Sequence, residues 1–120
     1  MMRYLSVHDL VWIDATVTGG SPTFGHDDVE ACMAAQYGYG NSTDVMSQAA
    51  SLLETLLRIR PFGEGNVRAA YVATIAFLLL NAGRLRLSAD QAADTVTRVA
   101  SGALDARAAI EDLAEPGGTA

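Results

Sequence analysis

Hydrophobic and polar positions divide the chain into segments with helical spacing, separated by short polar loops. The clearest segment is residues 44–59, where apolar side chains recur every three or four positions, as on one face of an α-helix. Further helices are expected at residues 6–17, 27–36, 66–81, 89–101 and 105–114. In no segment do hydrophobic and polar residues alternate as they do in a β-strand, although a short β-hairpin in one of the glycine-rich loops is an alternative. The pattern predicts an all-α bundle of about six helices.

Several residues mark where these helices should begin and end. Ser6 and Asp9 form a variant of the capping box, and Ser88 with Gln91 forms a regular one. The other predicted N-caps are Asp27 or Asp28, Ser42 or Thr43, and Asp105, and the predicted stops are Gly83 and Gly102.

The segment at residues 66–81 is the most apolar of the predicted helices. Between Tyr71 and Leu80 its only polar side chain, apart from the tyrosine hydroxyl, is Thr74. A helix that is apolar nearly all round is expected to be buried on all sides. We therefore predict that it is the central helix of a single domain spanning residues 1–115, followed by a flexible tail at residues 116–120.

Composition narrows the class of protein. The net charge of −6 argues against a general nucleic-acid binder, so we expect no DNA partner. The longest apolar run, residues 75–80, is too short to span a membrane, and the N-terminus lacks a signal-peptide core. We expect a cytoplasmic protein without a membrane partner.

The reactive residue types are few. The single cysteine, Cys32, excludes an internal disulfide and lies in an apolar pattern typical of a core position. All eight basic residues are arginine, which excludes lysine-based catalysis. His8 and His26 are interpreted as surface or capping residues. Arg58, Arg60 and Arg68 form a local positive cluster around one loop.

That loop, RPFGEGNVR at residues 60–68, has the composition of a phosphate-binding turn. Gly63 and Gly65 allow a tight turn and close approach of a ligand. Unpaired N–H groups at the start of the following helix, together with the helix dipole, favour an anion. Arg68 could bind two phosphate oxygens, and Glu64 could hold a magnesium ion. The alternative is a plain glycine-rich turn in which Asn66 caps the helix and Arg68 faces solvent.

The loop also resembles the signature of the Fic/Doc family, His-Pro-Phe-x-Asp/Glu-Gly-Asn-Gly/Lys-Arg. The matching residues are Pro61, Phe62, Glu64, Gly65, Asn66 and Arg68. YLSVHDLVWIDA, GHDDVEACMAAQYGYG and FLLLNAG extend the resemblance in the order typical of the death-on-curing (Doc) branch. The resemblance implies a compact all-α Fic/Doc-like fold around the helix after the loop.

The resemblance also implies an activity and its partners. Family members transfer AMP or phosphate from a nucleotide to a protein hydroxyl, and the motif histidine is the general base. By resemblance, ATP or another nucleotide binds with Mg²⁺, Glu64 holds the metal, Gly65, Asn66 and Arg68 hold phosphates, and Phe62 anchors the loop. The short chain has no convincing inhibitory helix, so the expected partner is a small antitoxin.

Two positions depart from the motif: Arg60 stands in place of the histidine, and Val67 in place of glycine or lysine. Guanidinium has no free lone pair to accept a proton, so Arg60 cannot act as the base. One hypothesis is a Doc-like toxin that Arg60 disarms. The other is a non-catalytic nucleotide- or phosphate-binding or interaction module. Independently of function, Arg60 could cap the preceding helix and pair with Glu64.

Overall fold

The structure, a computed structural model, describes residues 4–18, 26–37, 45–81 and 85–114. Within these ranges it contains α1 (Val7–Thr18), α2 (His26–Ala35), α3 (Val45–Ile59), the short 3₁₀ helix η2 (Gly63–Gly65), α4 (Asn66–Asn81), α5 (Ala89–Ala100) and α6 (Ala106–Leu113). The described part has no strand beyond one isolated bridge between Leu85 and Ala114. The predicted all-α bundle is confirmed, with helix ends within two residues of those expected.

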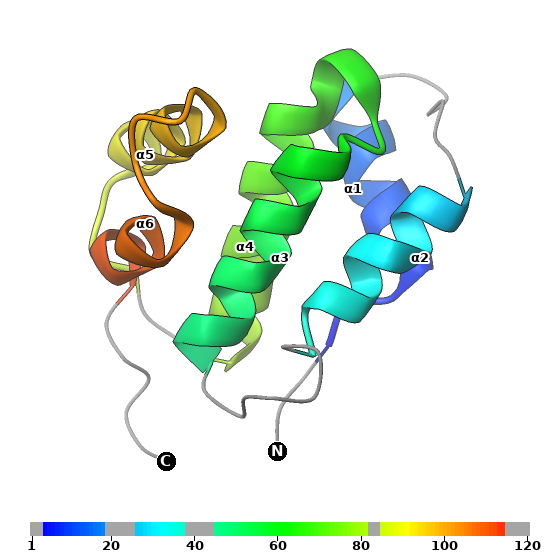
Figure 1. Cartoon of the computed structure of the whole chain (residues 1–120), viewed down its shortest axis with the longest axis horizontal. Helices are drawn as coiled ribbons and strands as arrows, with labels where there is room; N and C mark the ends of the chain where they lie inside the picture. The colour runs from blue at the N-terminus through cyan, green and yellow to red at the C-terminus, as the bar shows by residue number, and fades with distance from the viewer. Residues whose placement is uncertain (1–3, 19–25, 38–44, 82–84, 115–120) are drawn as a thin grey trace.

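The antiparallel pair α3 and α4 forms the middle of the bundle (Figure 1). Helices α1 and α2 lie on one side of this pair, and α5 and α6 lie on the other. Helix α4 contacts α1, α3 and α5, whereas α3 contacts α2, α4 and α6. The turn that joins α3 to α4 lies at one end of the bundle, where η2 packs against α1.

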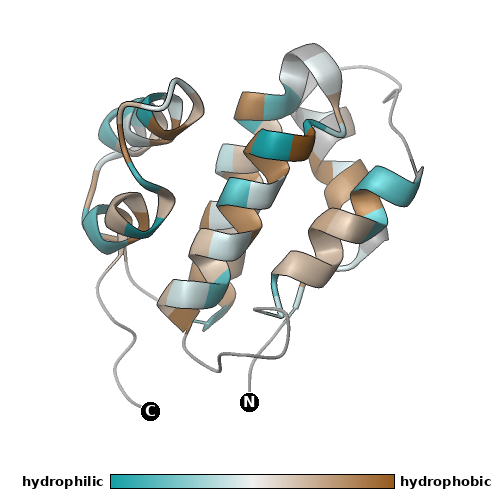
Figure 2. Cartoon of the chain, in the orientation of Figure 1, coloured by the Kyte–Doolittle hydropathy of each residue, from teal (hydrophilic) through white to brown (hydrophobic). Residues whose placement is uncertain are grey.

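The core follows from the amphipathic pattern of α3. The turns of α3 carry both hydrophobic and hydrophilic residues (Figure 2). The side chains of Leu52, Leu53 and Leu56 are fully buried. They pack in one cluster with residues from α1, α2, α4, α5 and α6. Cys32 belongs to this cluster and is fully buried, which confirms its predicted core position.

Helix α4 is central, but the prediction that it is buried on all sides is wrong. Leu79 and Leu80, near its C-terminal end, are 50% and 43% exposed. The buried face carries small residues, including Ala69, Ala70 and Ala73, against which neighbouring helices pack. The prediction from composition therefore overestimated the burial of α4, because apolar side chains can also lie at the protein surface. None of the helices in the described ranges has the length and hydropathy needed to cross a bilayer.

Three of the predicted caps form as expected. Ser6 and Asp9 exchange backbone-to-side-chain hydrogen bonds of 2.9 and 3.1 Å, and the box at Ser88 is complete. Asp105 caps α6 through a bond from the Ala108 N–H. Helix α5 ends before Gly102, which has a φ of +85°.

The prediction for the start of α2 is wrong, because Asp27 and Asp28 lie inside the first turn of the helix rather than at its cap. Acidic residues are favourable there because they face the positive end of the helix dipole. The predicted caps Ser42 or Thr43 and the stop at Gly83 lie outside the described residues.

Candidate functional site at the α3–α4 corner

Helix α3 ends at Ile59, and the next residue, Arg60, has a backbone φ of +55°. The N–H of Arg60 still donates to the Leu56 carbonyl at 3.1 Å, which closes the last turn. Pro61 follows, and a proline disfavours the right-handed helical conformation for the residue before it. Arg60 therefore ends the helix through its backbone conformation, whereas stabilisation of the helix end by its charge stays a prediction.

Asn66 holds the corner together from inside. Its side chain is 1% exposed, donates to the Leu56 carbonyl at 2.7 Å and accepts from the Phe62 N–H at 3.3 Å. Its own φ and ψ, −64° and −42°, are helical, so the interpretation of Asn66 as an N-cap is wrong. The amide instead joins the end of α3, the loop and the start of α4.

Gly63 and Arg60 bond to each other across the turn. The Gly63 N–H donates to the Arg60 carbonyl at 3.3 Å, and the Arg60 Nη2 donates to the Gly63 carbonyl at 3.3 Å. The same Gly63 carbonyl accepts the N–H of Asn66. Gly63 has a φ of +63°, and a Cβ added there would meet no atom within 4 Å outside its two chain neighbours. The turn thus favours glycine for its backbone conformation rather than for lack of space.

Phe62 fixes the loop to the core. Its side chain is buried in the main hydrophobic cluster, as expected for the anchor of the loop. Val67, which departs from the motif, is half-buried and packs against the same cluster. The loop is therefore attached to the bundle on both sides of η2.

Positive charge gathers at this end of the α3–α4 pair. Arg58, Arg60 and Arg68 are all exposed, and Arg68 is the third residue of α4. The first N–H groups of a helix lack partners within it and carry the positive end of its dipole. Together these donors fit a phosphate. The fold brings the sequence-predicted residues to one corner, with Asn66 on the inside; they are Gly63, Gly65, Asn66 and Arg68.

The predicted metal role of Glu64 stays a prediction, as does its pairing with Arg60, because its side chain lies outside what the structure describes. Among the described residues, no three His, Cys, Asp or Glu side chains gather in a way that could hold a metal. A magnesium ion at this corner would therefore depend on Glu64 and on phosphate oxygens of the nucleotide.

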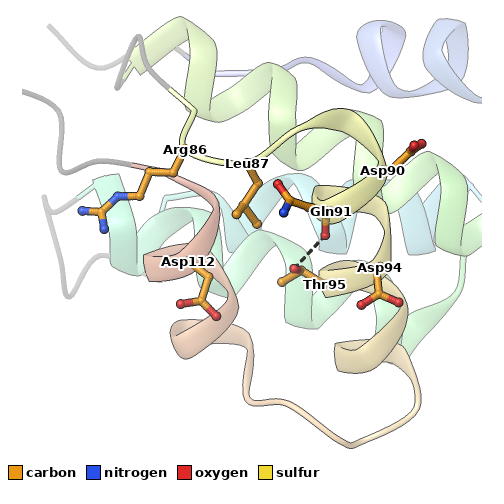
Figure 3. A pocket seen from close by; sticks show the side chains of 7 residues that line it. All are labelled: Arg86, Leu87, Asp90, Gln91, Asp94, Thr95 and Asp112. Carbon is orange, nitrogen blue, oxygen red and sulfur yellow. Dashed lines mark hydrogen bonds between the residues drawn. The ribbon is translucent and has the colours of Figure 1, made fainter.

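Two hollows lie away from this corner. A cavity of about 520 Å³ lies along α5 and α6 (Figure 3) and is lined by Asp90, Asp94 and Asp112 with Arg86. A second one, of about 310 Å³, includes Arg86, Arg107 and Glu111. The sequence pattern indicated neither of them. The larger hollow carries three carboxylates against one guanidinium, so it would repel a phosphate, and the α3–α4 corner is the better anion site.

Among the side chains that the structure describes, no other candidate group supplies a general base at the corner. His8 is exposed on the first turn of α1, and the side chain of His26 is not described. Burial raises the pKa of the Cys32 thiol to about 11, an effect that the charge of Asp28 adds to and Arg58 opposes. Cys32 therefore remains protonated near neutral pH.

The family model described as Fic/DOC family matches residues 9–78 of the 120-residue chain. The match begins within α1 and ends within α4, so it includes the whole α3–α4 corner. No curated protein matches the chain significantly.

Proposed function

Because the chain belongs to the Fic/DOC family, we propose that it is a Doc-like toxin of a toxin–antitoxin pair that binds a nucleotide but is disarmed as a transferase. The observation that carries this proposal is Arg60, which stands at the position of the motif histidine and follows the end of α3, beside a loop that otherwise departs from the motif only at Val67.

The corner would hold the nucleotide by its phosphates. Gly63 and Gly65 let the phosphates approach the backbone, Arg68 adds a two-pronged donor, and the N-terminus of α4 adds its dipole. Asn66 would contribute by keeping this corner in shape, since both ends of its amide are already bonded. A magnesium ion on Glu64 would neutralise phosphate charge.

The step that this chain should perform poorly is removal of the proton from the attacking hydroxyl. For a protein hydroxyl to attack a phosphorus atom, its proton must pass to a base, and a guanidinium cannot accept it. The α4 N-terminus and Arg68 would still bind the nucleotide. Loss of a general base costs about 10²- to 10⁴-fold in rate. We therefore expect nucleotide binding without efficient transfer.

Restoring the base tests this proposal. The Arg60→His variant and the parent chain are compared on a cell lysate with ATP labelled at the α- or the γ-phosphate. We expect the variant to label a protein or stop growth, and the parent to do neither. The label position would distinguish AMP transfer from phosphate transfer.

Two controls separate the base from other effects. Arg60→Gln removes the charge without adding a base and should stay inactive. Arg98→His places a histidine on α5 and should also stay inactive. Comparable labelling by the Arg60 parent would show that another group removes the proton.

Nucleotide binding is tested separately by calorimetry with ATP and magnesium. The parent chain should release or absorb heat on titration, and Arg68→Ala should bind more weakly because it loses a charged donor. No heat at millimolar ATP, or equal binding by Arg68→Ala, would contradict the proposed site.

The proposed partner is a small antitoxin encoded beside this chain, with a segment that folds onto the corner or a nearby groove. Co-expression and pull-down with the neighbouring gene product should recover a complex. If this chain is recovered alone and no small gene lies beside its own, the result would count against the proposal that it is a toxin.

A second candidate function is a non-catalytic phosphate-binding module. It is favoured by the permanent charge of Arg60 and by its bond to the Gly63 carbonyl, which integrates the arginine into the loop. This candidate predicts that Arg60→His neither labels a protein nor harms cells, although the parent binds ATP.

A further inference from the structure

The peptide that joins Gly63 to Glu64 has its carbonyl held from two sides. The Asn66 N–H donates to the Gly63 oxygen from the start of α4, and the Arg60 Nη2 donates to it at 3.3 Å. The described residues contain no cis peptide bond. In a planar trans peptide the C=O and the next N–H point in opposite directions. Fixing the Gly63 oxygen therefore fixes the direction of the Glu64 N–H.

The Glu64 N–H is directed away from the carbonyl that α4 and Arg60 hold. Gly63, beside it, has a φ of +63° and presents only hydrogen where another residue would carry a Cβ. Apart from the chain neighbours of Gly63, no atom lies within 4 Å of that position, so the space where a Cβ would stand is open. The Glu64 N–H belongs to the peptide beside this open position and can serve as a donor to an anion at the corner.

We propose that Arg60 is a positioning residue for this anion site: its guanidinium holds the Gly63 carbonyl and so aims the Glu64 N–H at a bound phosphate. The inference rests on the proposed phosphate site and extends it. It gives Arg60 a role that a charge alone does not supply, because the effect passes through one hydrogen bond and one peptide plane.

Four variants separate the hydrogen bond from the charge. Arg60→Gln keeps a side-chain donor and loses the charge, whereas Arg60→Met loses both. Arg58→Gln, at the neighbouring exposed arginine, loses one charge at the same end of α3 and serves as the matched control. Arg60→Lys keeps both the charge and a donor, so it should bind phosphate nearly as well as the parent chain does.

The measurement is the backbone amide spectrum of ¹⁵N-labelled protein, titrated with inorganic phosphate. Without phosphate, Arg60→Met should shift the Glu64 and Asn66 amide signals, whereas Arg58→Gln should leave them in place. With phosphate, Arg60→Gln and Arg58→Gln should weaken binding by similar factors. Arg60→Met should weaken it about 2- to 12-fold further, the value of one net hydrogen bond.

The outcomes distinguish the two proposals. If the parent spectrum does not respond to phosphate, the proposed phosphate site is wrong, and the ligand-free spectra still test the carbonyl contact. If Arg60→Met leaves the Glu64 amide unmoved, or binds phosphate as well as Arg60→Gln does, the positioning role is wrong. Should Arg60→Met lose the dispersed spectrum of a folded protein, Arg60→Ala takes its place as the variant without a donor.

Discussion

Replacing Asn66 by alanine would test whether the α3–α4 corner is held from inside. The asparagine amide makes two buried hydrogen bonds, to the Leu56 carbonyl and from the Phe62 N–H. Alanine keeps the helical backbone and removes both bonds. The free energy of unfolding should fall, because the end of α3 and the loop lose the side chain that joins them to α4.

The expected loss follows from the two bonds. Each net hydrogen bond contributes about 1 kcal/mol, so the pair contributes about 2 kcal/mol. The Leu56 carbonyl keeps the N–H of Arg60 as a donor, so its loss of the Asn66 amide adds little further cost. We therefore expect a total of about 2 kcal/mol, or a Tm lowered by about 8 °C for a domain of this size.

Urea unfolding followed by circular dichroism measures the loss, and thermal unfolding checks it. Asn66→Asp is the informative second variant, since it keeps an acceptor for Phe62 but places a carboxylate against the Leu56 carbonyl. Thr97→Ala is the control, because it removes one exposed side-chain bond to the Ala93 carbonyl. A loss below about 0.5 kcal/mol for Asn66→Ala, near the usual range for surface changes, would refute the reasoning.

Three further predictions concern other parts of the chain. Gly63→Ala should lower the unfolding free energy by about 1–2 kcal/mol without a steric clash, since its φ of +63° is unfavourable for a residue with a Cβ; an unchanged urea midpoint would contradict this. Ser88→Ala should cost about 1 kcal/mol, because it removes the side-chain half of the α5 capping box; Ser101→Ala, beyond the helix end, is its control. Cys32 should resist iodoacetamide at pH 8 until the protein unfolds. Because the folded pKa of Cys32, about 11, lies above its ordinary value of 9.0, the fold favours the neutral thiol, and stability should fall as pH rises from 9 to 11; Cys32→Ala should lack this thiol-dependent part of the fall.

Local sequence signals predicted most of the helices because their causes are local. The capping residues Ser88 and Asp105 bond within three residues of themselves, so their spacing is visible in the chain. The burial of α4 was predicted less well. Which of its apolar residues are covered depends on α1, α3 and α5, and the sequence of α4 alone does not contain that information.

The candidate site shows the same division. The motif placed Arg60, Gly63 and Arg68 at one corner, but it did not reveal that Asn66 points inward or that Arg60 has a positive φ. Likewise, nothing near Gln36 in the sequence indicates that its buried amide pairs with both backbone groups of Leu5, at 2.7 Å each. Such contacts join residues that only the folded chain brings together.

The internal anchoring of the loop by Asn66 has a thermodynamic consequence. A loop hinged freely on the surface could order around a ligand without affecting the rest of the domain. Here the loop is bonded to the end of α3 and packed into the core through Phe62, so the site exists only while the bundle is folded. A ligand of this corner must then stabilise the whole domain, by about 2.7 kcal/mol at a concentration 100 times its Kd. Melting temperature therefore becomes a general reporter for ligands of this chain, including ones that undergo no reaction.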